Sequence, residues 1–166
     1  MNKRQTKEIG LVLLNQFNSS WKMLRQAIEI IGDENWSKTA NNWSFVWTVY
    51  HIIETADYYR RNTPKGMEWG KRAGINWETD SEEIIEQKKI AITKAQVLAY
   101  LEDVKTQIIH FLENATDPDL LTTNDFDEGK LLILEKMLYL LRHNMHHIGE
   151  LNKALRDWKS QRIQWR

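Results

Sequence analysis

The stretch that decides the fold is ILEKMLYLLRHNMHHIGELNKAL, residues 133–155. At about 100° per residue, its apolar side chains fall on one broad arc of a helix, and charged residues such as Glu135 and Arg142 fall opposite. The pattern therefore predicts an amphipathic helix over about residues 129–158, with one face against a core. Asn144 falls near the middle of the arc, so it needs a hydrogen-bond partner. The arc consists of Ile133, Met137, Leu140, Leu141, Ile148, Leu151 and Leu155.

Three more segments carry the same helical period, over residues 3–31, 44–62 and 93–115. Gly32 follows the first segment as a stop signal, and Pro64 follows the second. Thr93 with Gln96 makes a capping-box pattern at the start of the third. Because the 166 residues include only 2 prolines and 7 glycines, we expect an all-α protein.

The connections between these segments differ in length. Residues 32–43 and 116–128 are short links, whereas residues 63–92 form a long link in which a short helix is expected over residues 81–89. A long link permits two neighbouring helices to run parallel. We therefore predict a single domain over residues 1–166, an all-α four-helix bundle with a long crossover connection.

Composition excludes several classes of partner. Lys+Arg and Asp+Glu both total 23, so the formal net charge is zero, which argues against a nucleic-acid-binding surface. No window approaches the roughly 18–20 apolar residues of a membrane span, and the apolar run at residues 9–14 is too short for a signal peptide. The chain has no cysteine, so it has no disulfide and no thiol nucleophile. We expect a cytoplasmic protein with neither nucleic acid nor membrane as a partner.

Three of the five histidines lie within residues 143–147. His143 and His147 are one helical turn apart at the edge of the apolar arc, whereas His146 falls with the charged residues and should face solvent. His51 lies beside the apolar stripe of the segment 44–62, among hydroxyl and aromatic side chains. Three neutral imidazoles with open positions for water are typical of a catalytic zinc site. We therefore take His51, His143 and His147 as candidate ligands of a first-row divalent metal such as Zn²⁺.

Each of these signals has an alternative interpretation. A histidine pair four residues apart also occurs on a polar helix edge where both rings are simply hydrogen-bonded. Glu150, one turn after His147, is expected to form a salt bridge, to orient a ligand or to act as a base. Glu54 is expected to pair with Arg60 or Arg61.

The eight tryptophans have two interpretations as well. Most are expected to anchor the core and the loops, as large amphipathic side chains commonly do. Trp43 and Trp47 flank the start of the second segment, and the other six are scattered along the chain. Some of the eight are candidates for the wall of an apolar substrate pocket or for a dimer face.

Two stretches together resemble the DinB/YfiT-like superfamily of DNA-damage-inducible and related bacterial proteins. They are NNWSFVWTVYHIIETADYY at residues 41–59 and HNMHHIGELNKALR at residues 143–156. The resemblance covers most of the chain in length, helix count and histidine placement. It implies a four-helix bundle, often dimeric, whose nickel- or zinc-binding histidines correspond to His51, His143 and His147. This chain has Ile148-Gly149-Glu150 where members often have Arg-Gly-Gln, which affects contacts near the site but not the ligands.

The resemblance also implies a function. Some relatives are S-transferases that use a low-molecular-weight thiol, and others are regarded as metal-dependent hydrolases. We expect a metal-dependent transferase acting on a small-molecule substrate with such a thiol as cosubstrate, in a homodimer. The alternatives are a metal-dependent hydrolase and a non-enzymatic, stress-related binding protein. The sequence assigns no catalytic residue beyond the metal ligands.

Overall fold

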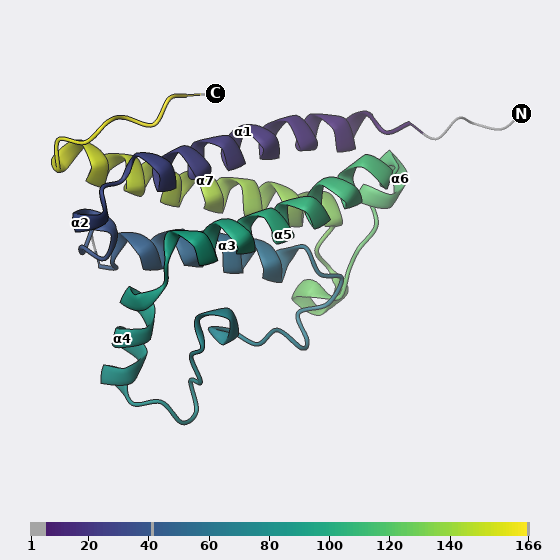
Figure 1. Cartoon of the computed structure of the whole chain (residues 1–166). Coiled ribbons are helices and arrows are strands. Elements are labelled where there is room, and N and C mark those ends of the chain that lie inside the picture. Colours follow the sequence, from purple (N-terminus) through teal and green to yellow (C-terminus); the bar gives the residue numbers. More distant parts are fainter. Residues whose placement is uncertain (1–5, 41, 166) are drawn as a thin grey trace, which may run out of the picture.

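The structure is a computed structural model that describes residues 6–40 and 42–165. Four long helices dominate it, α1 (Glu8–Ile30), α3 (Phe45–Tyr59), α5 (Lys94–Asn114) and α7 (Ile133–Asp157) (Figure 1). The shorter elements are α2 (Asp33–Trp36), α4 (Glu82–Ala91), α6 (Asp117–Leu120) and the 3₁₀ turns η1 (Lys71–Ala73) and η2 (Phe126–Gly129). The described residues contain no strand and only two isolated β-bridges, so the all-helical prediction is confirmed.

The four long helices pack so that each contacts two others. α1 packs against α5 and α7, and α3 packs against the same two helices. Figure 1 shows that α1 and α7 run in one direction while α3 and α5 run in the other. The connection from α3 to α5 must therefore cross the length of the molecule, and it does so as a projecting excursion that carries η1 and α4.

The ends of the helices follow mostly local signals. Thr93 makes the expected capping box with Gln96, and the Ser44 hydroxyl accepts the backbone N–H of Trp47 at the start of α3. The predicted start of the first helix at residue 3 lies outside the described residues, and the described helix begins at Glu8. Gly32 is not a left-handed stop, because its φ is −69° and it is the N-cap of α2.

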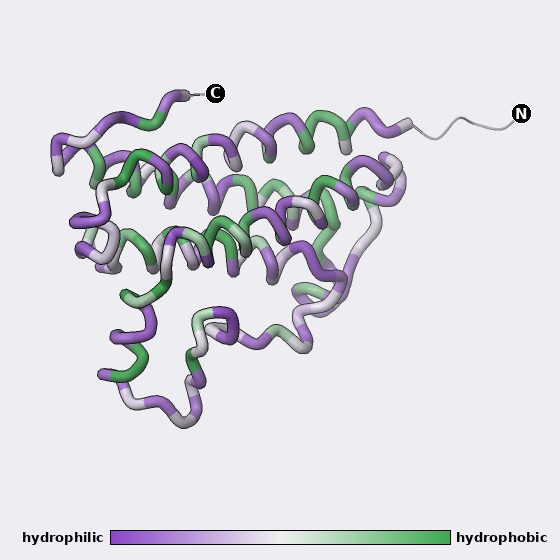
Figure 2. Tube along the Cα trace, in the orientation of Figure 1, coloured by the Kyte–Doolittle hydropathy of each residue, from purple (hydrophilic) through white to green (hydrophobic). Residues whose placement is uncertain are grey.

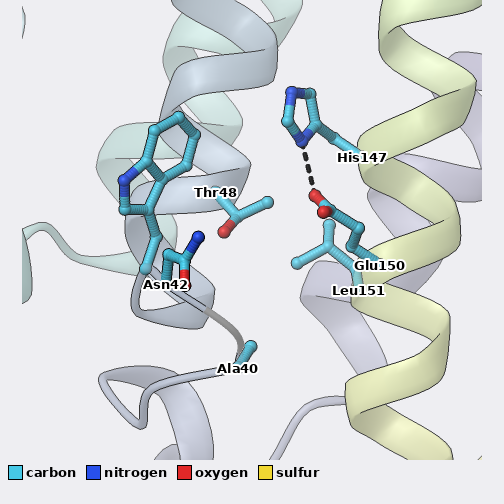
Figure 3. A pocket seen from close by; sticks show the side chains of 7 residues that line it. Ala40, Asn42, Thr48, His147, Glu150 and Leu151 are labelled. Carbon is cyan, nitrogen blue, oxygen red and sulfur yellow. Dashed lines mark hydrogen bonds and ion pairs between the residues drawn. The ribbon is translucent and has the colours of Figure 1, made fainter.

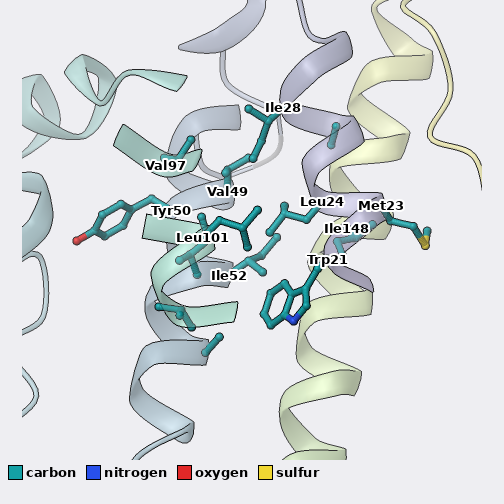
Figure 4. Packing of buried hydrophobic residues seen from close by; sticks show 14 of the residues in the cluster. Trp21, Met23, Leu24, Ile28, Val49, Tyr50, Ile52, Val97, Leu101 and Ile148 are labelled. Carbon is teal, nitrogen blue, oxygen red and sulfur yellow. The ribbon is translucent and has the colours of Figure 1, made fainter. Parts of the chain in front are cut away.

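The core is built from apolar side chains of all four long helices. Leu24, Val49, Leu101 and Ile148, one from each helix, are at most 1% exposed (Figure 4). Apolar residues recur along each of these helices between polar ones, which is the amphipathic pattern read from the sequence (Figure 2). Burial of these faces holds α3 and α7 side by side and so positions the site described below.

A buried carboxylate on α3 anchors the excursion. Glu54 is 3% exposed and accepts hydrogen bonds from the backbone N–H of Gly70 at 2.6 Å and from the Tyr50 hydroxyl at 3.0 Å. Burial raises the pKa of this carboxyl group. Gly70 has φ +76°, and a Cβ there would lie 2.7 Å from Trp77 Nε1, so the turn requires glycine. The predicted ion pair of Glu54 with an arginine is therefore wrong.

The two arginines pair with the next buried carboxylate instead. Arg60 Nη2 lies 2.7 Å from Asp57 Oδ1, and Arg61 Nη2 lies 3.6 Å from the same oxygen. Asp57 also accepts the Tyr100 hydroxyl at 2.8 Å, which ties α3 to α5. Asp57 is one turn closer to the arginines than Glu54, and this spacing decides between the two carboxylates.

None of the helices within the described part of the chain is long and apolar enough to cross a membrane.

Candidate metal centre

The antiparallel packing of α3 and α7 brings three histidines together. His51 comes from α3, and His143 and His147 come from successive turns of α7. His51 Nε2 lies 3.0 Å from His143 Nε2, and each ring offers a nitrogen within 4.8 Å of the others. The ring centroids are 5.0 Å apart for each pair that includes His51 and 4.6 Å apart for the α7 pair. The sequence-predicted set therefore converges on one point between two helices.

The donor set fits a first-row divalent metal. Two imidazole nitrogens at about 2.0–2.1 Å from one metal are separated by roughly 2.9–3.4 Å for the usual coordination angles. The 3.0 Å between His51 Nε2 and His143 Nε2 falls within that range. The pKa of His51 and that of His143 are both lowered to about 4, first by burial and then by the neighbouring histidines. Both rings are therefore neutral near pH 7, which is the form that binds a metal.

Glu150 holds the third ring. His147 Nδ1 lies 2.6 Å from Glu150 Oε2, the contact drawn as a dashed line in Figure 3. A proton on Nδ1 donated to this carboxylate leaves the Nε2 lone pair free for a metal. The carboxylate also lies 3.6 Å from His146 Nε2, but that side chain is 68% exposed. Of the roles considered for Glu150, the orientation of His147 is the one that its position supports.

Two other histidines lie outside the trio. His146 forms a second group with His147 and Glu150 within metal-ligand reach, but it faces solvent as predicted and shares His147 with the half-buried trio. His110 is exposed on α5, where its backbone carbonyl accepts the Asn114 amide. The half-buried trio of His51, His143 and His147 is therefore the better candidate for a metal centre.

In the described part of the chain, Asn144 lacks the hydrogen-bond partner that its place on the apolar arc predicts. It is 0% exposed, and neither polar atom of its side chain makes a hydrogen bond within the described residues. His143 Nδ1 is likewise buried and without a hydrogen bond there. The nearby Asn144 amide acts to raise the pKa of His143, and the larger effect of burial lowers it. The two groups are therefore close, but no hydrogen bond joins them.

Aromatic rings flank the trio on both sides. The Trp43 ring meets His51 edge-on at 4.8 Å between centroids and stacks with His147 at 6.0 Å. Tyr139 stacks with His143 at 6.3 Å. The tryptophans were predicted only collectively, as anchors, pocket walls or a dimer face, and Tyr139 was not predicted near the site. The available signal was its position four residues before His143, on the same side of α7.

A cavity of about 200 Å³ adjoins His147. In Figure 3, Asn42 and Thr48 stand on one side of it and Glu150 and Leu151 on the other. Ala40 and Asn42, which precede α3, were not predicted as part of a site, because their place follows from how the link between α2 and α3 folds back onto α7. The lining consists of Ala40, Asn42, Trp43, Thr48, His147, Glu150 and Leu151.

Comparisons with known proteins agree with this architecture. A search of curated proteins finds no match. A crystal structure of a DinB-like protein from Bacillus cereus ATCC 10987 is 18% identical and has a TM-score of 0.61, with 92% of this chain and 93% of that chain covered. At this identity the likeness shows the fold alone. Residues 16–151 match the sequence model of the DinB superfamily, and all three clustered histidines lie within that range. The chain therefore belongs to the DinB superfamily.

Proposed function

We propose that the protein is a metal-dependent enzyme built on a four-helix bundle with a long crossover, in which His51, His143 and His147 hold Zn²⁺ or Ni²⁺. The observation that carries the proposal is the convergence of imidazole nitrogens from two helices, with 3.0 Å between two of the Nε2 atoms. A divalent metal bound there supplies a Lewis-acid centre that lowers the pKa of a water or thiol beside it.

The donor set supports an open site rather than a closed structural one. Structural zinc sites have four protein ligands, whereas catalytic sites have three and keep a position for a small molecule. In the described residues, the metal-binding group around His51 contains three histidines and no fourth ligand. The cavity beside His147 gives a small molecule room to reach that position.

The protein's own residues have distinct roles in this proposal. Glu150 keeps His147 in the tautomer and orientation that present Nε2. Trp43 packs against His51 and His147, and Tyr139 packs against His143. These rings take part of the space that water would occupy beside the trio, which strengthens electrostatic interactions there.

The reaction that we propose is the transfer of a low-molecular-weight thiol to a small-molecule substrate in the cytoplasm. Membership of the DinB superfamily and the small size of the cavity support this choice. Turnover that requires added thiol is the expected result. Turnover with water alone would instead identify a metal-dependent hydrolase, and metal without turnover of any substrate would favour a non-enzymatic binding protein.

We also propose that the protein is a homodimer that binds neither nucleic acid nor membranes. Leu11 and Val12 on α1 are 54% and 62% exposed, and a second copy of the chain can cover this apolar surface. Light scattering on purified protein should give twice the monomer mass of 19.8 kDa. A mass that stays at the monomer value at high concentration would contradict the dimer.

The first experiment is elemental analysis of protein purified without an affinity tag. The wild type should contain about one equivalent of zinc or nickel, and His51→Ala and His147→Ala should both lose it. His110→Ala is the matched control, because this exposed histidine lies outside the trio. Far-ultraviolet circular dichroism should show that all variants keep their helices. Full metal occupancy in His147→Ala would show that the ligand assignment is wrong.

A further inference from the structure

The cavity beside His147 is small and largely apolar. Its volume of about 200 Å³ lies below the roughly 300–1,000 Å³ of pockets for drug-sized ligands, so it accepts only a small group. The Trp43 ring, the Leu151 side chain and the Ala40 methyl group supply much of its wall. The Thr48 hydroxyl is already used, because it donates to the Ser44 carbonyl at 3.1 Å. Such a wall favours an apolar ligand group and offers few hydrogen bonds to a polar one.

The only formal charge that the described side chains contribute to the cavity wall is negative. Among the described residues that line the cavity, Glu150 is the one acidic residue, and there is no lysine or arginine. Nearby cations are held elsewhere. Lys89 pairs with Glu86 at 2.5 Å and lies over the Trp47 ring, and Lys38 lies over the Trp158 ring. A negatively charged ligand group in the cavity would therefore face a carboxylate without a compensating cation from the wall.

The charge balance of the loaded site leads to the same conclusion. If the proposed centre held a divalent metal and a thiolate, the two positive charges of the metal would be offset by one negative charge on Glu150 and one on the thiolate. A second negative charge on the ligand would find no net positive charge to attract it. It would also lose hydration on entering an apolar cavity.

We propose, on the basis of the metal centre proposed above, that this cavity receives the uncharged, mainly apolar part of a thiol ligand and discriminates against a carboxylate. The thiol class that fits the site is therefore a small thiol whose tail carries no acidic group near the sulfur. Glu150 then has two roles, since it orients His147 and excludes anions from the cavity.

A matched pair of thiols tests the proposal on the zinc-loaded protein. The probes are 4-mercaptobutanamide and 4-mercaptobutyrate, which have nearly the same shape and differ by one charge. Methyl NMR titration measures the two dissociation constants and places each probe through the signals of Ala40, Thr48 and Leu151. We expect the amide to bind about tenfold more tightly or better, as a like-charge contact near a protein surface predicts. Equal affinity, or tighter binding of the acid, would overturn the proposal.

Variants separate the charge effect from the support that Glu150 gives to His147. Asn42 lines the cavity. Among the described residues, its side chain makes no hydrogen bond to His51, His143 or His147. Asn42→Lys adds a cation to the wall and should reverse the preference, and Asn42→Asp should increase it. Asp157→Asn is the control, because it removes a carboxylate from the same helix as Glu150 at an ion pair with Lys153 outside the cavity. It should leave the ratio unchanged.

Failure of the metal centre is distinguishable from failure of this proposal. If the protein takes up no zinc, the proposed function fails, and the same two probes are then titrated into the metal-free protein. The wall and Glu150 are still present there, so the amide should remain the tighter ligand with signals at the same methyl groups. Loss of that preference in the metal-free protein would overturn the assignment of the cavity as well.

Discussion

Replacing Asn144 with leucine should stabilise the protein. Asn144 is 0% exposed on α7, and neither atom of its amide has a hydrogen bond in the described part of the chain. Each buried, unsatisfied polar group costs about 1–3 kcal/mol, and leucine has the same branched shape, a larger volume and no polar atom. The amide has two such groups, but leucine will not fit the site perfectly, and the strain of repacking offsets part of the gain. We therefore expect Asn144→Leu to raise the free energy of unfolding by about 1–3 kcal/mol.

The assay is urea unfolding of the metal-free protein, followed by circular dichroism, with a thermal scan as a second measure. A gain of 1 kcal/mol corresponds to about 2–4 °C in Tm for a chain of this size. The matched control is Asn152→Leu on the same helix. Asn152 Oδ1 accepts the backbone N–H of Ile163 at 3.2 Å, so its loss should cost about 0.5–1.5 kcal/mol.

The opposite result for Asn144→Leu would refute the reasoning. A loss of more than about 1 kcal/mol, as large as that of the control or larger, would mean that the amide is hydrogen-bonded in solution. His143 Nδ1 is the buried group beside it that also needs a partner. In that case Asn144 would orient His143 as Glu150 orients His147, and the variant should also bind metal less tightly.

Three further predictions concern the ligand support, the buried lysine and the excursion. Glu150→Gln should weaken metal binding by about 10–100-fold while the helices persist, as competition with a chelator measures; unchanged affinity would exclude its orienting role. Burial lowers the pKa of Lys136 from 10.5 to about 8, so the unfolded chain binds more protons between these values. The free energy of unfolding of the wild type should therefore rise by about 1–3 kcal/mol from pH 8 to pH 10.5, compared with that of Lys136→Met. Urea titrations at each pH measure both values, and the same pH dependence in the two proteins would contradict this. Gly70→Ala should cost about 1–3 kcal/mol, because alanine is strained at φ +76° and its Cβ would press on Trp77; a loss below 0.5 kcal/mol would show that the turn adapts.

Lys136 illustrates how a buried charge is tolerated in this fold. It is 2% exposed, yet its ammonium group donates to the Arg61 carbonyl at 2.6 Å and lies 4.6 Å from the centroid of the Phe126 ring. The carbonyl groups just beyond the end of α3 carry the partial negative charge of a helix C-terminus, which favours a cation. The contact joins α3 to the start of α7 and so helps to hold the two helices that carry the histidines.

Local signals in the sequence account for the helices and for half of the candidate site. Apolar spacing and the Thr93 capping box depend on residues within one or two helical turns. They therefore predict the four long helices, and most of the predicted helix ends lie within a few residues of the described ones. The convergence of His143 and His147 has the same origin, since a spacing of four residues places two side chains on one face of any helix.

Only the tertiary structure decided how separate segments meet. Three features join segments that are far apart in the sequence, and no local pattern sets the distance between such segments. They are the approach of His51 to His143, the hydrogen bond from the Gly70 N–H to Glu54, and the cavity lined by Trp43 and His147. Their positions depend on which helices pack together and on the path of the long excursion, and both follow from burial of the whole core rather than from neighbouring residues. The sequence by itself determined which residues have the chemistry to bind a metal, and the packing of α3 against α7 decided that they lie close enough to do so.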